Sequence, residues 1–184
     1  MTLRNTSTRY GSLAIALHWA MLLLIALVYL CIEMRGYFPK GSATRDALKT
    51  WHFMLGSTVF LLATVRLVVH LADGAPGITP APARWQRIAS RVVHLLLYGF
   101  MLAMPILGWL LLGAEGKSVP FFGLQLPVPI AQDPALAEQL EEIHESIGSA
   151  GYGLIGLHAA AALFHHAIRR DDTLRRMLPW SRQV

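Results

Sequence analysis

The chain is poor in cysteine and in charge. Of its 184 residues one is cysteine, Cys31, which excludes a disulfide within the chain. Charged residues make up 15% and apolar residues 54% of the sequence, and the mean hydropathy is +0.46. The chain is more apolar and less charged than an average globular protein, which favours a membrane protein over a water-soluble domain.

Long stretches also lack Asp, Glu, Lys and Arg. Three windows of 23 residues contain none of them, and a fourth of similar length is interrupted by Arg66; they cover residues 10–32, 92–114, 146–168 and 50–72. About 20 apolar residues suffice to cross a bilayer, and unsatisfied backbone groups are costly in lipid. We therefore predict one all-α domain over residues 1–184, a transmembrane four-helix bundle with helices near 11–33, 50–71, 91–113 and 135–169.

The connections and the basic residues give the expected topology. Residues 74–82 form a turn-rich link, and the stretch VPFFGLQLPVP is expected to be irregular. Asp133 and Pro134 are a plausible N-cap and first-turn pair for the last helix. The two tails and the second loop carry ten Lys or Arg residues and the first and third loops five. Both termini should therefore be cytoplasmic.

Histidines recur at matched depths in these helices. His144 and His158 are fourteen residues apart, a rise of ~21 Å with a return to within about 40° of the same face. The number of residues between each histidine and the charged residue at the end of its helix gives the depth of that histidine in the membrane. His52 and His144 form an outer pair, His18 and His158 an inner pair, His94 and His165 a level at the inner headgroups, and His70 and His166 are left over.

Paired imidazoles inside a membrane favour a metal cofactor. Histidine in hydrocarbon is costly, and neutral imidazole is a good ligand of haem iron. Zinc would prefer more ligands, often Cys or carboxylate. The alternative is that these histidines form hydrogen bonds between packed helices. No Cys-x-x-Cys-His motif is present, which excludes covalent attachment of a haem through that motif.

Two further features are compatible with a bound macrocycle. Gly148, Gly151 and Gly156 flank the histidine face of the last span, although small residues also serve close helix packing. Arg66 lies fourteen residues after His52 and so faces the same way at the level of the inner pair. Its guanidinium is suited to a haem propionate, and the alternative is that it extends to the membrane interface.

From about Tyr10 to Pro179 the chain resembles the bacterial cytochrome b561 family. The likeness rests on LHW at 17–19, MRGYFP at 34–39, GYGLIGLHAAAALFHH at 151–166 and DDTLRRMLP at 171–179. The resemblance implies a di-haem membrane protein with two haem b groups stacked across the membrane. It implies that His18 and His158 ligate the inner iron and His52 and His144 the outer one. It also implies quinone binding near the inner haem, where His94 and His165 stand; helix tilt leaves His94 open as an inner ligand in place of His18.

The first outer loop contains an unexpected group of basic residues. We call Arg35, Lys40, Arg45 and Lys49 the loop cluster; it ends three residues before His52. A local positive field raises the local concentration of a small anion such as superoxide. Binding of lipid headgroups or of an acidic partner is the alternative, and the third loop is rich in acidic residues.

The resemblance and this cluster lead to an expected activity. We predict an oxidoreductase of the bacterial inner membrane, a superoxide:ubiquinone oxidoreductase that passes electrons from superoxide at the periplasmic face to ubiquinone. The expected partners are superoxide, ubiquinone and the lipid bilayer, with no nucleic acid and no obligatory protein partner. Two alternatives remain: an electron-transfer subunit of a dehydrogenase or hydrogenase, and a haem-free membrane protein such as a metal transporter.

Overall fold

Four long helices make up most of the protein. The computed structural model describes residues 2–178, with α1 at Ser12–Met34, α2 at Ala43–Asp73, α3 at Arg84–Ala114 and α4 at Pro134–Phe164. Within that range each of the four is long and apolar enough to cross a membrane. The predicted all-α transmembrane four-helix bundle is confirmed.

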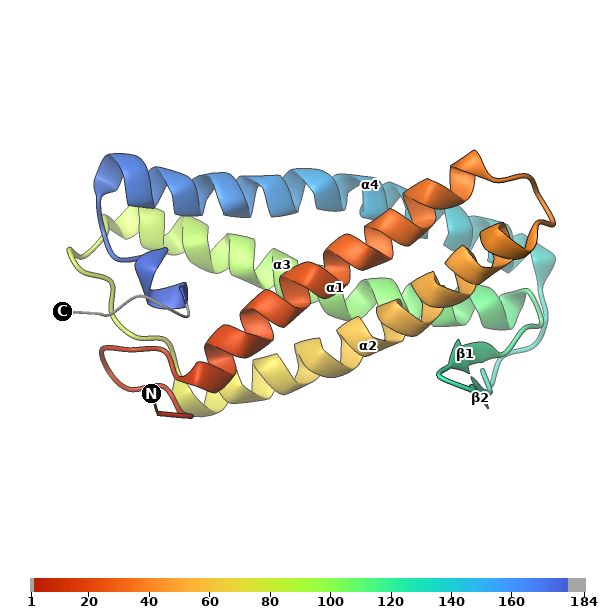
Figure 1. Cartoon of the computed structure of the whole chain (residues 1–184), viewed down its shortest axis with the longest axis horizontal. Coiled ribbons are helices and arrows are strands. Elements are labelled where there is room, and N and C mark those ends of the chain that lie inside the picture. Colours follow the sequence, from red (N-terminus) through yellow and green to blue (C-terminus); the bar gives the residue numbers. More distant parts are fainter. Residues whose placement is uncertain (1, 179–184) are drawn as a thin grey trace.

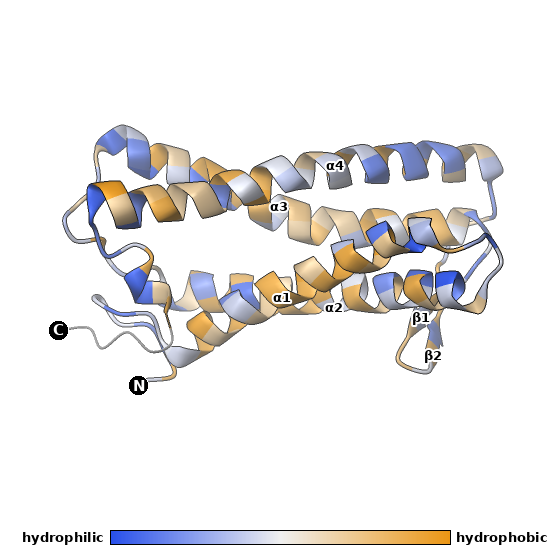
Figure 2. Cartoon of the chain, turned by 45° about the horizontal axis from the view of Figure 1, so that its top comes forward, coloured by the Kyte–Doolittle hydropathy of each residue, from blue (hydrophilic) through white to orange (hydrophobic). Residues whose placement is uncertain are grey.

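The surface of the bundle is suited to lipid rather than water. Apolar residues cover most of α1, while the first half of α4 is hydrophilic (Figure 2). Leu23, Val68, Leu95 and Leu163 are each 60% or more exposed. Exposed apolar side chains on every helix would be unfavourable in water, whereas lipid tails cover them at no such cost. The protein is therefore a multi-pass membrane protein.

The helices pack in sequence order, α1 against α2, α2 against α3 and α3 against α4 (Figure 1). A small core of Met21, Val59, Ala63 and Met101 joins the first three helices. Among the described residues, the backbone of α4 makes few close approaches to α1 or α2. Contacts between α4 and these two helices therefore depend on side chains.

The two ends of the bundle differ. The N-terminal segment, the link 74–83 and the segment after α4 meet at one end, which we call the terminal end (Figure 1). At the other, the hairpin end, lie the short helix η1 at Arg35–Tyr37 and the strands β1 at Val119–Phe121 and β2 at Leu124–Leu126. After α4 come one π-helical turn, η2 at His165–Arg169, and the short helix η3 at Arg175–Met177.

The expectation of irregular structure in VPFFGLQLPVP was wrong. The strands β1 and β2 pair antiparallel, with Phe121 opposite Leu124. Phe122 and Gly123 form the turn, with φ of 45° and 90°. A two-residue turn with both φ values positive matches the twist of paired strands, and Asn-Gly is its usual sequence. Phe-Gly does not give that signal, and the prolines beside it argue for a loop.

Two helices begin earlier than the charge pattern predicts. α2 begins at Ala43 rather than residue 50, because the Ser42 hydroxyl accepts a hydrogen bond from the backbone N–H of Arg45. α3 begins at Arg84 rather than residue 91. Charged residues end a hydrocarbon window, but they are good helix formers and continue a helix into the interface. The predicted N-cap of the last helix is confirmed, since the Asp133 carboxylate accepts from the N–H groups of Ala135 and Leu136.

Candidate haem-binding site

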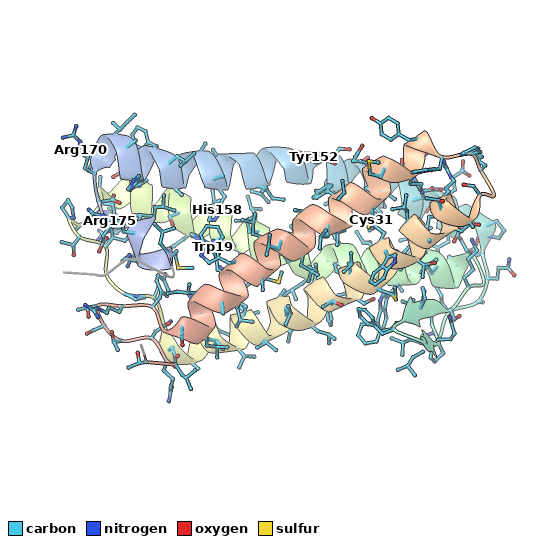
Figure 3. The ribbon with its side chains drawn as sticks, viewed as in Figure 1. Trp19, Cys31, Tyr152, His158, Arg170 and Arg175 are labelled. Carbon is cyan, nitrogen blue, oxygen red and sulfur yellow. The ribbon has the colours of Figure 1, made fainter. Side chains whose placement is uncertain are left out.

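The inner pair lies between α1 and α4. The ring centroids of His18 and His158 are 6.1 Å apart, with the ring planes at 63°. Both residues are half-buried. His158 points from α4 toward α1, where Trp19 follows His18 (Figure 3). The Trp19 ring meets that of His18 edge to face at 5.5 Å, and its indole N–H donates to the Met177 carbonyl at 2.6 Å.

The outer pair lies between α2 and α4 with nearly the same geometry. The ring centroids of His52 and His144 are 6.2 Å apart, with the planes at 70°. Nδ1 of His52 is 3.1 Å from the Val28 carbonyl. Because a carbonyl can only accept, this nitrogen carries the proton, which leaves Nε2 of His52 free for a metal.

The spacing within each pair suits one metal ion between two imidazoles. A metal–imidazole nitrogen bond is about 2 Å long, and two such bonds plus the radii of the rings add up to about 6 Å. Within the described residues no group of three or more His, Cys, Asp or Glu side chains is placed to hold a metal ion. The donor set is therefore two imidazoles at each of two levels, which fits axial ligation of haem iron.

Unpaired polar atoms give the same indication. Among residues 2–178, Nδ1 of His18 and Nδ1 of His144 are buried without a hydrogen-bond partner. An unsatisfied buried polar group is costly, and in native proteins such groups often mark a functional site. One member of each pair therefore has a nitrogen that the protein alone does not satisfy. The residues of both pairs fit a haem at each level.

The glycines around the pairs have different surroundings. A Cβ on Gly108 would lie 3.4 Å from Cε1 of His144, at van der Waals contact, so this position of α3 borders an imidazole of the outer pair. A Cβ on Gly151 would overlap the Tyr29 hydroxyl and the Phe100 ring, which favours close helix packing as its role. Around Gly156 nothing in the described residues lies within 4 Å of such a Cβ.

His94 lies at the inner pair rather than beside His165. Its ring centroid is 5.3 Å from that of His158, and its Nδ1 lies 2.6 Å from the Ser90 carbonyl in the preceding turn. Among the described residues no ring contact joins His94 to His165. Nδ1 of His165 instead lies 2.5 Å from Oδ2 of Asp171. The two residues expected at one quinone site thus have different neighbours.

Arg66 lies at the inner pair. It is half-buried, within electrostatic range of His18, His94 and His158, and its guanidinium carbon is 5.9 Å from the centroid of the Tyr98 ring. The ring of His70 stacks on the same Tyr98 ring, with the two centroids 6.2 Å apart. A positive charge inside a membrane needs a partner, and a carboxylate of a bound cofactor is one of suitable chemistry.

The loop cluster divides into residues with different surroundings. Arg35 lies within electrostatic range of His52. The Arg45 guanidinium donates to the carbonyls of Arg35 and Phe38, at 2.9 and 3.0 Å, and so holds the η1 turn in shape. Lys40 is exposed and Lys49 half-buried. Sequence reasoning missed this structural role of Arg45, because no local pattern marks it.

Comparison with known proteins gives the family. A sequence profile described as prokaryotic cytochrome b561 matches residues 9–180. The chain is 39% identical over 171 residues to Cytochrome b561 homolog 1 of Escherichia coli (strain K12), covering 93% of this chain and 97% of that protein. It is 34% identical over 174 residues to the Probable superoxide oxidase CybB of Yersinia pestis, covering 95% and 98%. Its identity to Cytochrome b561 homolog 2 of Escherichia coli is 29% over 182 residues, covering 97% and 95%.

These matches run over nearly the whole chain and include both histidine pairs. The resemblance seen in the sequence is thereby confirmed. The chain belongs to the prokaryotic cytochrome b561 family, membrane-bound electron-transfer proteins that bind haem b.

Proposed function

We propose that this protein oxidises superoxide to dioxygen at the hairpin end and uses the electrons to reduce ubiquinone near the terminal end. The observation that carries the proposal is the pair of equivalent bis-histidine sites, 6.1 and 6.2 Å between ring centroids, at two levels of one bundle. Two one-electron sites in series connect the two faces of a membrane. The name of the Yersinia pestis relative, a probable superoxide oxidase, supports superoxide as the electron donor.

The ligand assignment follows the geometry of the pairs. We assign His18 and His158 to one haem b and His52 and His144 to the other, with Arg66 available to a propionate of the first. When bound, haem b supplies one-electron redox chemistry, and the protein tunes it through ligands, hydrogen bonds and burial. His52 contributes through its hydrogen bond to the Val28 carbonyl, which fixes the ring and raises the basicity of Nε2.

At the hairpin end the chain attracts and admits a small anion. This end faces the periplasm in our proposal, because most basic residues lie at the terminal end. Arg35, Lys40 and Lys49 supply a local positive field, and Arg45 holds the η1 turn that carries Arg35. Such a field raises the on-rate of an anionic substrate. Each superoxide that leaves as dioxygen gives up one electron.

At the terminal end two electrons and two protons convert ubiquinone to ubiquinol. His94 and His165 are the imidazoles that we assign to this site, where each can donate a hydrogen bond to a quinone carbonyl or act as a general acid. His94 has Nδ1 engaged by the Ser90 carbonyl, and His165 has Nδ1 engaged by Asp171. Each therefore has Nε2 free for the quinone.

The test uses the purified, haem-loaded chain without any other protein. Superoxide from an enzymatic source and a soluble ubiquinone analogue are added, and quinol formation is followed. We expect quinol at a ratio of one per two superoxide ions consumed, and a lower rate in the Arg35→Gln variant. If superoxide and quinone together gave no quinol while both haems were present, the proposal would fail. The chain would then be better described as an electron-transfer subunit that needs a partner dehydrogenase.

A further inference from the structure

The segment after α4 folds back under the inner pair. In its helix η3, the Met177 carbonyl accepts a hydrogen bond from the indole N–H of Trp19 at 2.6 Å. The buried guanidinium of Arg176 donates to the carbonyls of Pro76 and Gly77, at 2.7 and 2.8 Å. Residues 171–178 are thus held against the helix link and against the tryptophan beside His18. They close the terminal end of the bundle next to the proposed quinone site.

Asp171 lies at the start of this segment and is bound to His165. Its side chain is 3% exposed, and Oδ2 lies 2.5 Å from Nδ1 of His165. Oδ1 accepts the backbone N–H of Thr173 at 3.0 Å, and the backbone N–H of Asp171 donates to the His165 carbonyl at 3.2 Å. Both carboxylate oxygens and the backbone N–H of Asp171 are therefore directed to His165 or to Thr173.

The carboxylate of Asp171 is kept ionised. Burial alone would raise its pKa, but hydrogen bonds from His165 and Thr173 outweigh burial and hold the pKa below its usual value. An ionised carboxylate can only accept, so the proton between the two side chains belongs to Nδ1 of His165. That leaves Nε2 as the free nitrogen, and a second proton there gives an imidazolium that the adjacent carboxylate stabilises.

We propose that Asp171 is a positioning residue for proton transfer to the quinone: it fixes the tautomer of His165 and stabilises the imidazolium that protonates the reduced quinone. The inference rests on the proposed function, because it requires a quinone at the terminal end. In each transfer the Nε2–H bond of the imidazolium breaks and an O–H bond forms on the reduced quinone oxygen. The imidazole then takes a new proton at Nε2 from water. One such transfer from His165 and one from His94 to the other quinone oxygen supply the two protons of ubiquinol, and superoxide supplies the two electrons.

The neighbouring carboxylate offers a matched control. Oδ1 of Asp172 accepts the backbone N–H of Thr79 at 2.9 Å and lies 3.5 Å from Nε of Arg176. Asp172 therefore holds the same segment to the helix link, but within residues 2–178 its side chain contacts Thr79 and Arg176 and no histidine. If the effect on kcat comes only from loosening the segment, substitutions at Asp171 and Asp172 should lower kcat equally. A substitution that removes a proton-transfer partner should act at Asp171 alone.

The experiment compares Asp171→Asn, Asp171→Glu and Asp172→Asn in the haem-loaded full chain. Five quantities are measured: the rate of haem reduction by superoxide, kcat and KM for a soluble ubiquinone analogue, the solvent deuterium isotope effect on kcat, and the midpoint of thermal unfolding. Because general acid–base catalysis contributes about 10²–10⁴-fold, we expect Asp171→Asn to lower kcat by about 10²-fold. KM and haem reduction should stay at the wild-type values, and the isotope effect should rise.

The conservative and control variants should behave differently. Asp171→Glu should recover most of kcat, and Asp172→Asn should leave kcat and the isotope effect unchanged even if it lowers the unfolding midpoint. ¹⁵N NMR of histidine-labelled protein gives a readout that does not depend on turnover. It should show His165 protonated at Nδ1 in the wild type, with a less deshielded Nδ1–H in Asp171→Asn.

Four results would overturn the inference. A wild-type kcat in Asp171→Asn would exclude the role of Asp171 while leaving the proposed function intact. An equal loss of kcat in Asp172→Asn would assign the effect to the fold of the segment. If the wild type reduced no quinone, the proposed function and this inference would fail together. Should Asp171→Asn not retain haem, His165→Gln serves in its place, and a wild-type kcat in that variant would contradict the proposal.

Discussion

The Tyr29 hydroxyl in α1 donates a hydrogen bond to the Gly148 carbonyl in α4, at 2.7 Å. The ring of Tyr29 also lies 4.3 Å from that of Tyr152, whose hydroxyl donates to Glu33 at 2.7 Å. Tyr29 lies near the outer pair, because the carbonyl of the preceding Val28 contacts His52 and Gly148 is one turn from His144. The backbones of α1 and α4 make few close approaches within the described residues. This contact therefore helps to set the distance between the helices that carry the inner pair.

Replacing Tyr29 by Phe should lower stability modestly. The variant keeps the ring and loses one hydrogen bond between helices, which is worth about 0.5–1.5 kcal/mol. Thermal unfolding of the haem-loaded protein in detergent measures the change. Tyr37→Phe is the control, because Tyr37 is 81% exposed. Equal unfolding midpoints for the two variants would show that the Tyr29 contact contributes nothing.

Replacing Gly151 by Ala should be more damaging. The new Cβ would lie 2.6 Å from Cζ of Phe100 and would also overlap the Tyr29 hydroxyl. Overpacking of this kind costs about 1–3 kcal/mol, and here it would also push α4 away from α1. We expect a lower unfolding midpoint and weaker retention of haem, measured by the absorbance of haem per chain.

Gly153→Ala is the matched control for that substitution. Within the described residues nothing lies within 4 Å of a Cβ at Gly153. Because Ala is the better helix former, this variant should be neutral or slightly stabilised. A similar loss of haem in both variants would contradict the packing role assigned to Gly151.

The sequence predicted the parts of the structure that depend on local pattern. Charge-free windows located the membrane helices, and Asp133 marked the start of α4. Counting along ideal helices also pairs His18 with His158 and His52 with His144, and the structure brings the same rings together. This works because a helix has a fixed rise and each window is tied to the membrane boundaries by its charges.

Contacts between distant segments could not be predicted in the same way. The sequence places His165 at the depth of His94, yet its partner is Asp171, which folds back after α4. The stretch DDTLRRMLP carries the family resemblance, but no periodicity in it indicates that Asp172 binds Thr79. The hairpin at β1 and β2 was missed because its turn uses Phe122 where Asn is usual.

Neutralising Arg35 should slow the reaction with superoxide. Arg35→Gln removes a positive charge within electrostatic range of His52, so the second-order rate of haem reduction should fall by about threefold to tenfold. The dependence of that rate on ionic strength should also weaken. Stopped-flow absorbance at several salt concentrations measures both effects.

Lys117→Gln provides the comparison for Arg35. Lys117 lies at the same end of the bundle, but its ammonium group pairs with Glu115 at 3.0 Å. Its removal should change the rate by less than about twofold, since a paired surface charge contributes little field. If the two variants slowed the reaction equally, general surface charge rather than the loop cluster would attract the anion.

Acid should loosen the segment after α4. The pKa of Asp171 is lowered in the folded protein, because the hydrogen bonds from His165 and Thr173 outweigh burial. The ionised carboxylate therefore stabilises the folded protein at any pH above the pKa of Asp in the unfolded chain, about 3.9. This stabilisation is lost as the pH falls through the lower pKa of the folded protein. The protection of residues 171–178 against hydrogen exchange, taken relative to the intrinsic exchange rate at each pH, should therefore fall below about pH 4 in the wild type. In Asp171→Asn this pH dependence should be weaker; an unchanged acid profile would contradict the link.

The identity of the second inner ligand can be decided by substitution. The ring centroid of His158 lies 6.1 Å from that of His18 and 5.3 Å from that of His94. The distance to His18 matches that of the outer pair, and Nδ1 of His18 is buried without a partner among the described residues. We expect His18→Ala to lose the inner haem and His94→Ala to keep it, by visible spectra of the purified variants. The opposite pattern would assign the ligand role to His94.

The most direct test of the account is the haem content and low-spin EPR spectrum of the purified wild type, His144→Ala and His158→Ala. The wild type should contain two haem b groups per chain, each with the low-spin signal of bis-imidazole ligation. His144→Ala and His158→Ala should each lose one signal and about half of the haem, and the signals lost should differ. A wild type with a single haem, or a variant that keeps both low-spin signals, would contradict the two bis-histidine sites.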